Sequence, residues 1–233
     1  MQVRVGTSGY SYKEWKGHFY PEKIKPAEML AFYAKRLNTV EINNTFHRMP
    51  KKAMLLGWAE QVPDDFSFVL KASRRITHNQ RLEDCQETLG YLLGSAAVLQ
   101  GRLGPILFQM PPWFKKDVPR LREFLKILPD DLYAAFEFRS SSWLDDEVYD
   151  ALRASNCAWV VSDTAKNDPP AVVATADYGY LRLRREAYDD DALRDWAKRI
   201  REQDWKAAWV FFKHEEEGAG PKLAARFNEI LGG

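Results

Sequence analysis

The chain has 233 residues and a formal net charge of +1, because 34 Lys and Arg residues stand against 33 Asp and Glu residues. Hydrophobic residues make up 45% of it, which is too large a share for an intrinsically disordered protein. A charge balance this close to neutral gives no support for a protein that coats DNA or a membrane over its whole surface. The length fits one large α/β domain.

Other global features indicate a cytoplasmic protein. Its two cysteines, Cys85 and Cys157, lie far apart and form no CxxC pair, so we expect reduced and mostly buried thiols. The start, MQVRVGTSGY, lacks the basic residues and apolar run of a signal peptide. No apolar run approaches the ~20 residues that a membrane helix needs, so no membrane partner is expected.

Eight β-rich apolar runs alternate with helical patterns along the chain. We predict strands at 2–6, 38–43, 66–71, 104–109, 133–139, 157–163, 178–184 and 207–213. Apolar residues spaced at i, i+3, i+4 and i+7 predict the intervening helices, at 30–37, 55–62, 82–99, 121–128, 148–152, 193–200 and 223–231. Asp117 and Asp145 stand where helix N-caps are expected.

Strand followed by helix, repeated, predicts parallel strands joined by right-handed crossovers. Eight such units predict a (β/α)8 TIM-type barrel, with residues 1–233 forming a single domain. One unit is incomplete. Residues 164–177 contain a proline pair and are too short for a full helix, so we expect the crossover helix between strands six and seven to be missing. An open doubly wound sheet is the alternative fold, but its glycine-rich nucleotide fingerprint is absent.

Polar residues stand at the carboxyl ends of seven predicted strands, where barrel enzymes keep their chemistry. Residues two apart on a strand share a face, so these side chains are expected to point into the barrel mouth. They are Glu41, Asn43, Lys71, Gln109, Glu137, Arg139, Asp163, Arg182, Arg184 and Lys213. Barrel interiors also hold purely structural salt bridges, and Glu137–Arg139 or Glu41–Lys71 are candidates for such pairs.

From this ring we assign Glu137, Glu41, Lys71 and Asp163 as candidate catalytic residues, because buried charged neighbours tune the pKa of acid–base groups. Asn43, Gln109, Arg139, Arg182 and Lys213 are candidate substrate-binding residues. The loops after the strands add basic and aromatic side chains, among them Tyr10, His78 and Trp113. A basic, aromatic mouth suits a small anionic substrate that contains a sugar or a phosphate, and it also suits nucleic acid.

We predict no metal and no cofactor. The four histidines show none of the usual zinc-binding spacings. Glu41, Glu137 and Asp163 offer the oxygen ligands that Mg²⁺ or Mn²⁺ prefers, so a divalent cation is the alternative. The interleaved lysine and arginine side chains already supply positive charge, which argues against it.

Long segments of the chain resemble the domain-of-unknown-function family number 72, the YecE-like proteins. The segments are GTSGYSYKEWKGHFYP, TVEINNTFHRMP, LFQMPPWF, FEFRSSSW, the SDT at 162–164 and TADYGYLRL. The resemblance implies a TIM barrel close to the xylose-isomerase and endonuclease IV type. Its motif positions fall here on Gly6, Ser8, Gly9, Glu41, Asn43, Lys71, His78, Gln109, Glu137, Arg139, Asp163 and Arg182, and this adds Ser8 to the candidate substrate-binding residues.

The sequence departs from the family pattern at Tyr10, His47, Arg184 and Arg185. The related barrel enzymes use metal clusters with histidine ligands that this chain lacks. Three functions remain open: an isomerase, lyase or hydrolase acting by acid–base chemistry, a nucleic-acid-binding or DNA-processing protein, and a ligand-binding protein without catalysis. The sequence leaves the oligomeric state open.

Overall fold

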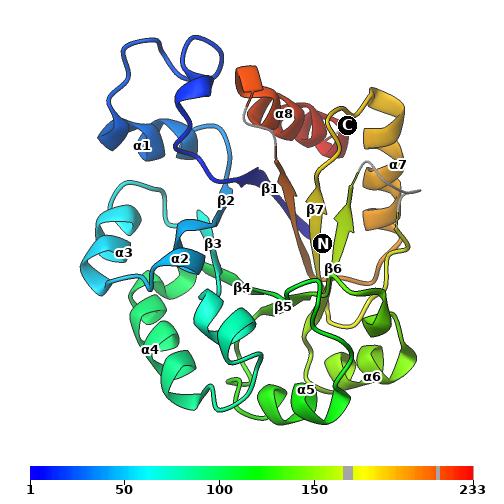
Figure 1. The fold of residues 1–233 in the computed structure, drawn as a ribbon. Coiled ribbons are helices and arrows are strands. Elements are labelled where there is room, and N and C mark those ends of the chain that lie inside the picture. Colours follow the sequence, from blue (N-terminus) through cyan, green and yellow to red (C-terminus); the bar gives the residue numbers. More distant parts are fainter. Residues whose placement is uncertain (165–169, 214–215, 233) are drawn as a thin grey trace.

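The computed structural model describes residues 1–164, 170–213 and 216–232. Its eight strands are β1 (Gln2–Ser8), β2 (Thr39–Ile42), β3 (Ser67–Lys71), β4 (Leu103–Gln109), β5 (Ala134–Glu137), β6 (Ala158–Asp163), β7 (Tyr178–Leu183) and β8 (Ala207–Phe212). They form a closed barrel in chain order, and β8 pairs in parallel with β1 to complete it (Figure 1). The predicted (β/α)8 TIM-type barrel is confirmed, and every predicted strand overlaps an observed one.

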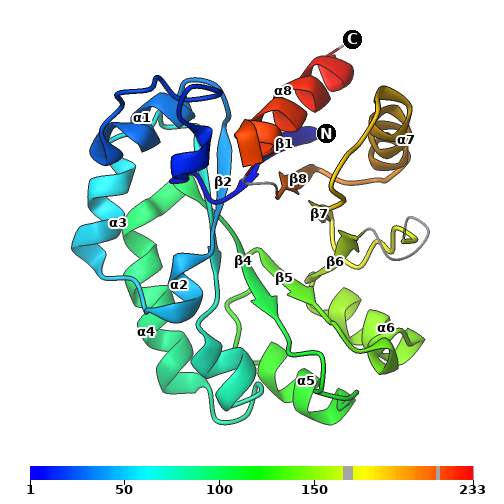
Figure 2. The ribbon, with the colours of Figure 1, turned by 45° about the horizontal axis from the view of Figure 1, so that its top comes forward.

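Helices follow the strands, and most of them surround the barrel on its outer face, as the turned view of Figure 2 shows. They are α1 (Met29–Ala34), α2 (Asn44–His47), α3 (Lys52–Ala59), α4 (Gln86–Ala96), α5 (Val118–Leu125), α6 (Asp146–Ala154), α7 (Asp190–Arg201) and α8 (Ala219–Gly232). The predicted N-caps are present, because the carboxylates of Asp117 and Asp145 accept hydrogen bonds from the backbone N–H groups of Arg120 and Glu147. Each cap satisfies a backbone donor that the first turn leaves without an intrahelical partner.

The connection between β6 and β7 has the irregular form that the sequence predicts. Its described residues, 164 and 170–177, contain no helix, and residues 165–169 lie outside the described residues. The Thr175 hydroxyl accepts a 2.7 Å hydrogen bond from Trp159 N and donates one of 2.7 Å to Cys157 O. Val172 and Val173 pack against the two outer hydrophobic clusters. Extended chain thus covers part of the barrel wall that a helix usually covers.

The segment 82–99 departs from its predicted single helix. Leu82 and Asp84 have φ values of 69° and 49°, so the helix begins only after them, at Gln86. A 3₁₀ turn, Ala97–Arg102, follows α4 and contains Gln100 at φ 49°. The elements that were not predicted include the short helix α2 and a π-helical turn, Arg75–Asn79, directly after β3. Single π-helical turns often occur at functional sites.

Inside the barrel the side chains form an apolar lower layer and a polar upper layer. Val69, Leu107, Val160, Tyr180 and Phe211 are buried together within the ring of strands. Above them, at the carboxyl ends of the strands, the inward positions carry charged and amide groups. This division places the polar chemistry at the mouth, on a packed apolar base.

The pairing of β1 with β2 requires a glycine. Gly6 on β1 pairs with Thr39 on β2, and a Cβ at Gly6 would lie only 2.0 Å from the Thr39 carbonyl oxygen. Only glycine lets the two backbones approach this closely.

Within the described residues, we find no helix with the length and apolar character required to span a lipid bilayer.

Candidate functional site

A buried ion cluster forms the floor of the mouth. The Arg182 guanidinium, on β7, donates to Glu41 Oε1 at 2.7 Å and to Glu137 Oε2 at 2.5 Å. Tyr180 Oη donates to the other Glu41 oxygen at 2.7 Å, and Asn43 Nδ2 donates to Glu41 Oε1 at 3.2 Å. Arg182 is 1% exposed and Glu41 is 0% exposed. The cluster therefore crosses the barrel from β7 to β2 and β5 beneath the open part of the mouth.

Lys71 is joined to this floor through a glutamine. Its Nζ donates to Gln109 Oε1 at 2.8 Å, and Gln109 Nε2 donates to Glu137 Oε2 at 2.8 Å. Lys71 Nζ also lies 4.3 Å from the centroid of the Phe46 ring, a cation–π contact. Among the residues described, no carboxylate lies within ion-pair distance of this ammonium group. Because Arg182 already binds both glutamates, Lys71 has a neutral amide as its hydrogen-bond partner.

The pairing fixes the charge of the two glutamates. Burial alone would raise the pKa of Glu41, but the attraction and hydrogen bond of Arg182 lower it to about 2. The pKa of Glu137 is lowered in the same way, against its burial, by Arg182 and by the hydrogen bond from Gln109. Both carboxylates therefore remain ionised near neutral pH, and neither is a ready general acid.

Lys71 is affected in the opposite sense. Burial and the nearby Arg182 charge lower its pKa to about 8, although Glu41 and Glu137 partly oppose the shift. His78, on the π-helical turn, packs its ring 5.0 Å from the Phe46 ring. Burial and the Lys71 charge lower the pKa of His78, so its imidazole is neutral at pH 7. Two groups that contact Phe46 thus have lowered pKa values.

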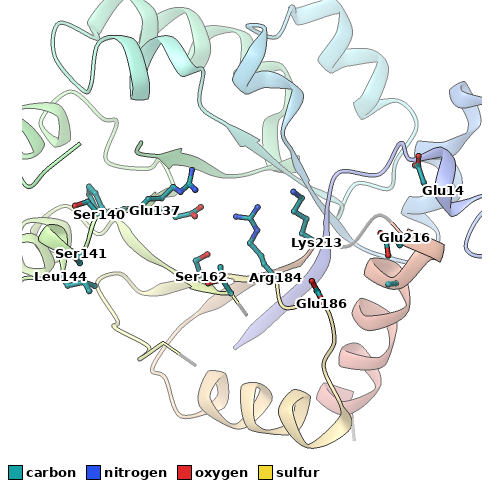
Figure 3. A pocket seen from close by; sticks show the side chains of 14 residues that line it. Glu14, Glu137, Ser140, Ser141, Leu144, Ser162, Arg184, Glu186, Lys213 and Glu216 are labelled. Carbon is teal, nitrogen blue, oxygen red and sulfur yellow. The ribbon is translucent and has the colours of Figure 1, made fainter. Parts of the chain in front are cut away.

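A pocket of about 1290 Å³ opens beside the cluster, over the ends of β5 to β8. Arg139, Arg184 and Lys213 line it together with Glu137. Figure 3 shows Arg184 and Lys213 side by side near the pocket centre, both directed toward the side that holds Glu137. No ion pair joins any of these three cations to a carboxylate in the described part of the chain. These cations share the pocket lining with the carboxylates of Glu14, Glu137, Glu186 and Glu216.

The two flanks of the pocket differ in chemistry. One carries the hydroxyls of Ser140, Ser141 and Ser162, which lie on the β5 and β6 side. The opposite flank carries the carboxylates of Glu14 and Glu216, visible across the pocket in Figure 3. An anion is therefore attracted toward the strand ends and repelled from the far rim.

The predicted orientation of Asp163 is wrong. Its carboxylate does not point into the mouth but accepts hydrogen bonds from Arg185 Nε at 2.8 Å, Tyr188 Oη at 3.0 Å and Trp196 Nε1 at 3.2 Å. Trp196 lies on α7, outside the barrel wall. Ser162, one residue earlier, takes the inward position. The prediction placed the mouth residue one position too late, and side chains alternate faces along a strand.

Three further predicted residues, Ser8, Tyr10 and Trp113, lie outside the pocket lining. So do the predicted residues that form or adjoin the buried cluster, namely Glu41, Asn43, Lys71, His78, Gln109 and Arg182. Ser8 is buried at the end of β1 beside Glu41, its partner in the strand register. The Tyr10 ring packs 6.3 Å from that of Tyr33 in the folded first loop. Trp113 is 57% exposed, with the Arg81 guanidinium 5.9 Å from its ring. None of the three lines the pocket.

Sequence reasoning left several participants out of the candidate site residues, among them Arg184 and Tyr180. Arg184 lies two positions after Arg182, so the alternation of side chains along β7 could have indicated that it also faces inward. Arg184 lines the pocket, whereas Arg182 does not. Tyr180 reads as an ordinary core aromatic, and no local pattern indicates its hydrogen bond to Glu41, 139 positions away.

The residues proposed for a divalent cation do not fit one. Asp163 lies on the outer side of the barrel wall, and Arg182 occupies oxygens of both Glu41 and Glu137. Within the residues described, no group of three or more His, Cys, Asp or Glu side chains is placed to hold a metal ion.

The fold and the mouth define a TIM-type α/β barrel protein with a polar pocket at the carboxyl ends of its strands, lined by three cations and four glutamates. Residues 4–233 match the profile of the family described as protein of unknown function DUF72, and the chain belongs to this family. The UPF0759 protein YunF of Bacillus subtilis is 25% identical over 98% of this chain and 94% of its own length. The UPF0759 protein YecE of Escherichia coli is 34% identical over 46% of this chain and 40% of its own length.

Solved structures support the same assignment. A DUF72 family protein of Thermotoga maritima superposes with a TM-score of 0.87 at 29% identity, covering all of both chains. A DUF72 family protein of Enterococcus faecalis has a TM-score of 0.82 at 20% identity and covers 99% of this chain and 96% of its own. A methyltransferase of Methanosarcina mazei, with a TM-score of 0.53 at 11% identity over 98% of this chain and 94% of its own, is alike in fold alone.

Proposed function

We propose that this protein is an enzyme that performs acid–base chemistry on a small anionic substrate bound in the pocket at the barrel mouth. The observation that carries the proposal is the group of three cations, Arg139, Arg184 and Lys213, which line one pocket without forming an ion pair among the described residues. Cations left unpaired at the mouth of a barrel lower the free energy of an anion placed between them. Carboxylate and phosphate groups match the planar fork of an arginine.

The walls of the pocket supply groups for the rest of the substrate. The hydroxyls of Ser140, Ser141 and Ser162 suit the polar substituents of a sugar or a hydroxy acid. Glu137 holds Arg182 and Gln109 through the same oxygen, Oε2, so its other oxygen remains to accept a hydrogen bond from a substrate hydroxyl. Glu41, which has both oxygens bonded and is sealed from solvent, positions Arg182 instead.

Proton transfer falls to Lys71 in this proposal. An efficient general acid or base has a pKa near the working pH, and the pKa of Lys71, at about 8, meets that condition. The paired glutamates do not, because Arg182 keeps them ionised. The classes of reaction that suit such a site are isomerisation, lyase chemistry and hydrolysis, and we place the activity in the cytoplasm.

Anion binding is the first test. Inorganic phosphate, pyruvate and ribose 5-phosphate should each raise the melting temperature of the protein, whereas uncharged ribose should not. Replacing Arg184 by Gln should weaken phosphate binding, measured by calorimetry, by roughly 10- to 100-fold, the effect of one charge-assisted hydrogen bond.

A matched control separates this effect from a general loss of charge. Arg122 on α5 is exposed and lies outside the pocket, so Arg122→Gln removes the same charge and should leave phosphate affinity unchanged. Equal binding of ribose and ribose 5-phosphate, or equal weakening in the two variants, would contradict the proposal. Product formation that survives Lys71→Met would remove Lys71 from the chemistry.

A nucleic-acid-binding protein is the second candidate, and a separate surface favours it. Trp113 is exposed beside Arg81, an arrangement that suits a stacked base and its phosphate. Binding of single-stranded DNA should then weaken steeply with salt and should fall on Trp113→Ala. This candidate fails if phosphate binds in the barrel pocket but DNA binding is not detected at any salt concentration. A third candidate, ligand binding without catalysis, predicts an unchanged ligand after long incubation, as measured by mass spectrometry.

A further inference from the structure

Lys71 combines three properties that no cation of the pocket shares. It is 9% exposed, its Nζ lies over the Phe46 ring, and its hydrogen-bond acceptor among the described residues is the neutral amide oxygen of Gln109. Gln109 Oε1 accepts a hydrogen bond from an uncharged amine as well as from an ammonium group. The site therefore retains its hydrogen bonding when the lysine loses its proton.

The surroundings also favour the uncharged amine. The carboxylates that would otherwise stabilise an ammonium group, Glu41 and Glu137, are both bound to Arg182. Burial, Arg182 and Arg184 all oppose the positive charge on Lys71 and lower its pKa to about 8. A buried amine beside other cations is the arrangement that makes lysine a nucleophile toward carbonyl groups.

We propose that Lys71 is a covalent catalytic residue, whose amine forms an imine with the aldehyde or ketone group of an anionic carbonyl substrate. This inference rests on the proposed function, because the anionic part of that substrate would occupy the cations beside the cluster. The substrate class is therefore a 2-oxo acid or a sugar phosphate in its open-chain form.

The step is balanced without any other reagent. The nitrogen lone pair attacks the carbonyl carbon, a C–N bond forms, and the carbonyl oxygen takes up the proton that the nitrogen releases. The resulting hydroxyl then leaves as water with one further proton, which gives the protonated imine. His78 is neutral at pH 7 and contacts the same Phe46 ring, so it is placed to carry protons for these transfers. The imine in turn acidifies the neighbouring C–H or weakens the neighbouring C–C bond, as isomerases and lyases require.

The experiment traps the imine in the full-length protein. The protein is incubated at pH 7.5 with cyanoborohydride and pyruvate, dihydroxyacetone phosphate or acetone, and the modified lysines are located by peptide mass spectrometry. Among the lysines we expect one adduct per chain, at Lys71, formed about tenfold or more faster than at the exposed Lys35, because an ordinary lysine is almost fully protonated at this pH. The two anionic probes should outcompete neutral acetone. As the pH rises toward 10, the preference for Lys71 over Lys35 should shrink.

Two variants complete the test. Lys71→Arg keeps the positive charge but has no nucleophilic amine, so its specific adduct should disappear, whereas Lys35→Arg should retain it. Label spread evenly over exposed lysines in the wild-type protein overturns the inference, and that result does not depend on the folding of any variant. If phosphate still binds and Arg184→Gln still weakens it while Lys71 stays unlabelled, the imine is wrong and anion binding stands. If phosphate binding also fails, both proposals fall.

Discussion

Two buried acidic clusters lie on opposite sides of the same barrel wall, and they differ in what surrounds them. Inside, Glu41 and Glu137 share Arg182 at the floor of an open pocket. Outside, Asp163 binds Arg185, Tyr188 and Trp196 between the barrel and α7. In the outer cluster both Asp163 oxygens accept hydrogen bonds, and Asp163 does not line the mouth pocket. The inner cluster adjoins Lys71, which forms no ion pair among the described residues. A buried charge alone therefore does not mark a functional site, and the neighbouring unpaired groups do.

The largest expected effect comes from removing the cation that the inner cluster shares. Arg182→Met leaves two buried carboxylates uncompensated and should lower the free energy of unfolding by about 3–5 kcal/mol, measured by urea denaturation. Adding Glu41→Gln and Glu137→Gln to that variant should recover much of the loss, because the buried charges are then removed together. A loss below about 1 kcal/mol in the single variant would show that the cluster is open to water.

The next largest effect is the pH dependence of stability, which tests the lowered pKa of Lys71. Its folded-state pKa of about 8 lies below the unfolded value, so the unfolded chain binds the proton more tightly between pH 8 and about 10.5. The cost of burying the ammonium group is fully present below pH 8 and disappears as the pH rises. Relative to Lys71→Met, the wild-type protein should gain on the order of 3 kcal/mol between pH 7.5 and 10.5 in urea denaturation. A difference that stays constant across this range contradicts the lowered pKa.

A substitution in the outer cluster should change the stability of the protein and not its phosphate affinity. Asp163→Asn places an amide N–H against groups that are themselves donors, and it should cost about 1–3 kcal/mol of unfolding free energy. Phosphate affinity should not change, because the side chain lies outside the wall. A tenfold loss of phosphate affinity at unchanged stability would indicate that the Asp163 side chain points into the mouth.

The smallest effect is expected for Ser162, the residue that precedes Asp163. Ser162→Ala removes one pocket hydroxyl and should weaken binding of ribose 5-phosphate by roughly 2- to 10-fold, the effect of one neutral hydrogen bond. Stability should change by less than about 0.5 kcal/mol. In the same calorimetric and urea experiments, Ser162→Ala should lower affinity and leave stability unchanged, whereas Asp163→Asn should lower stability and leave affinity unchanged. Two variants with the same profile would refute the assigned alternation on β6.

The fold was predictable because its signals are local. Alternating and continuous apolar runs located all eight strands, and acidic N-caps located the starts of α5 and α6. The start of α4 was missed because Leu82 and Asp84 adopt left-handed backbone conformations that their residue types rarely take. The strand-end rule also placed Glu41, Lys71, Gln109 and Glu137 in one mouth, and the structure brings these four together.

Pairing within the mouth was not predictable. The sequence suggested Glu137–Arg139 and Glu41–Lys71 as ion pairs, but Arg182 binds both glutamates. Which cation reaches a given carboxylate depends on side-chain positions across a closed barrel, between residues more than 40 positions apart. The same limit applies to Asp163, where one position along a strand decides which side of the wall a carboxylate faces.

The closure of the barrel also has a consequence for synthesis. β1 pairs with β8 along its length, with Gln2 opposite Ala207. At the usual rate of translation, roughly 5–20 residues per second, β8 leaves the ribosome some 10 to 40 s after β1. Until then one edge of β1 has no native partner, and an open strand edge is a template for pairing with other chains. The nascent chain therefore carries an aggregation-prone edge that disappears only when nearly the whole barrel has been made.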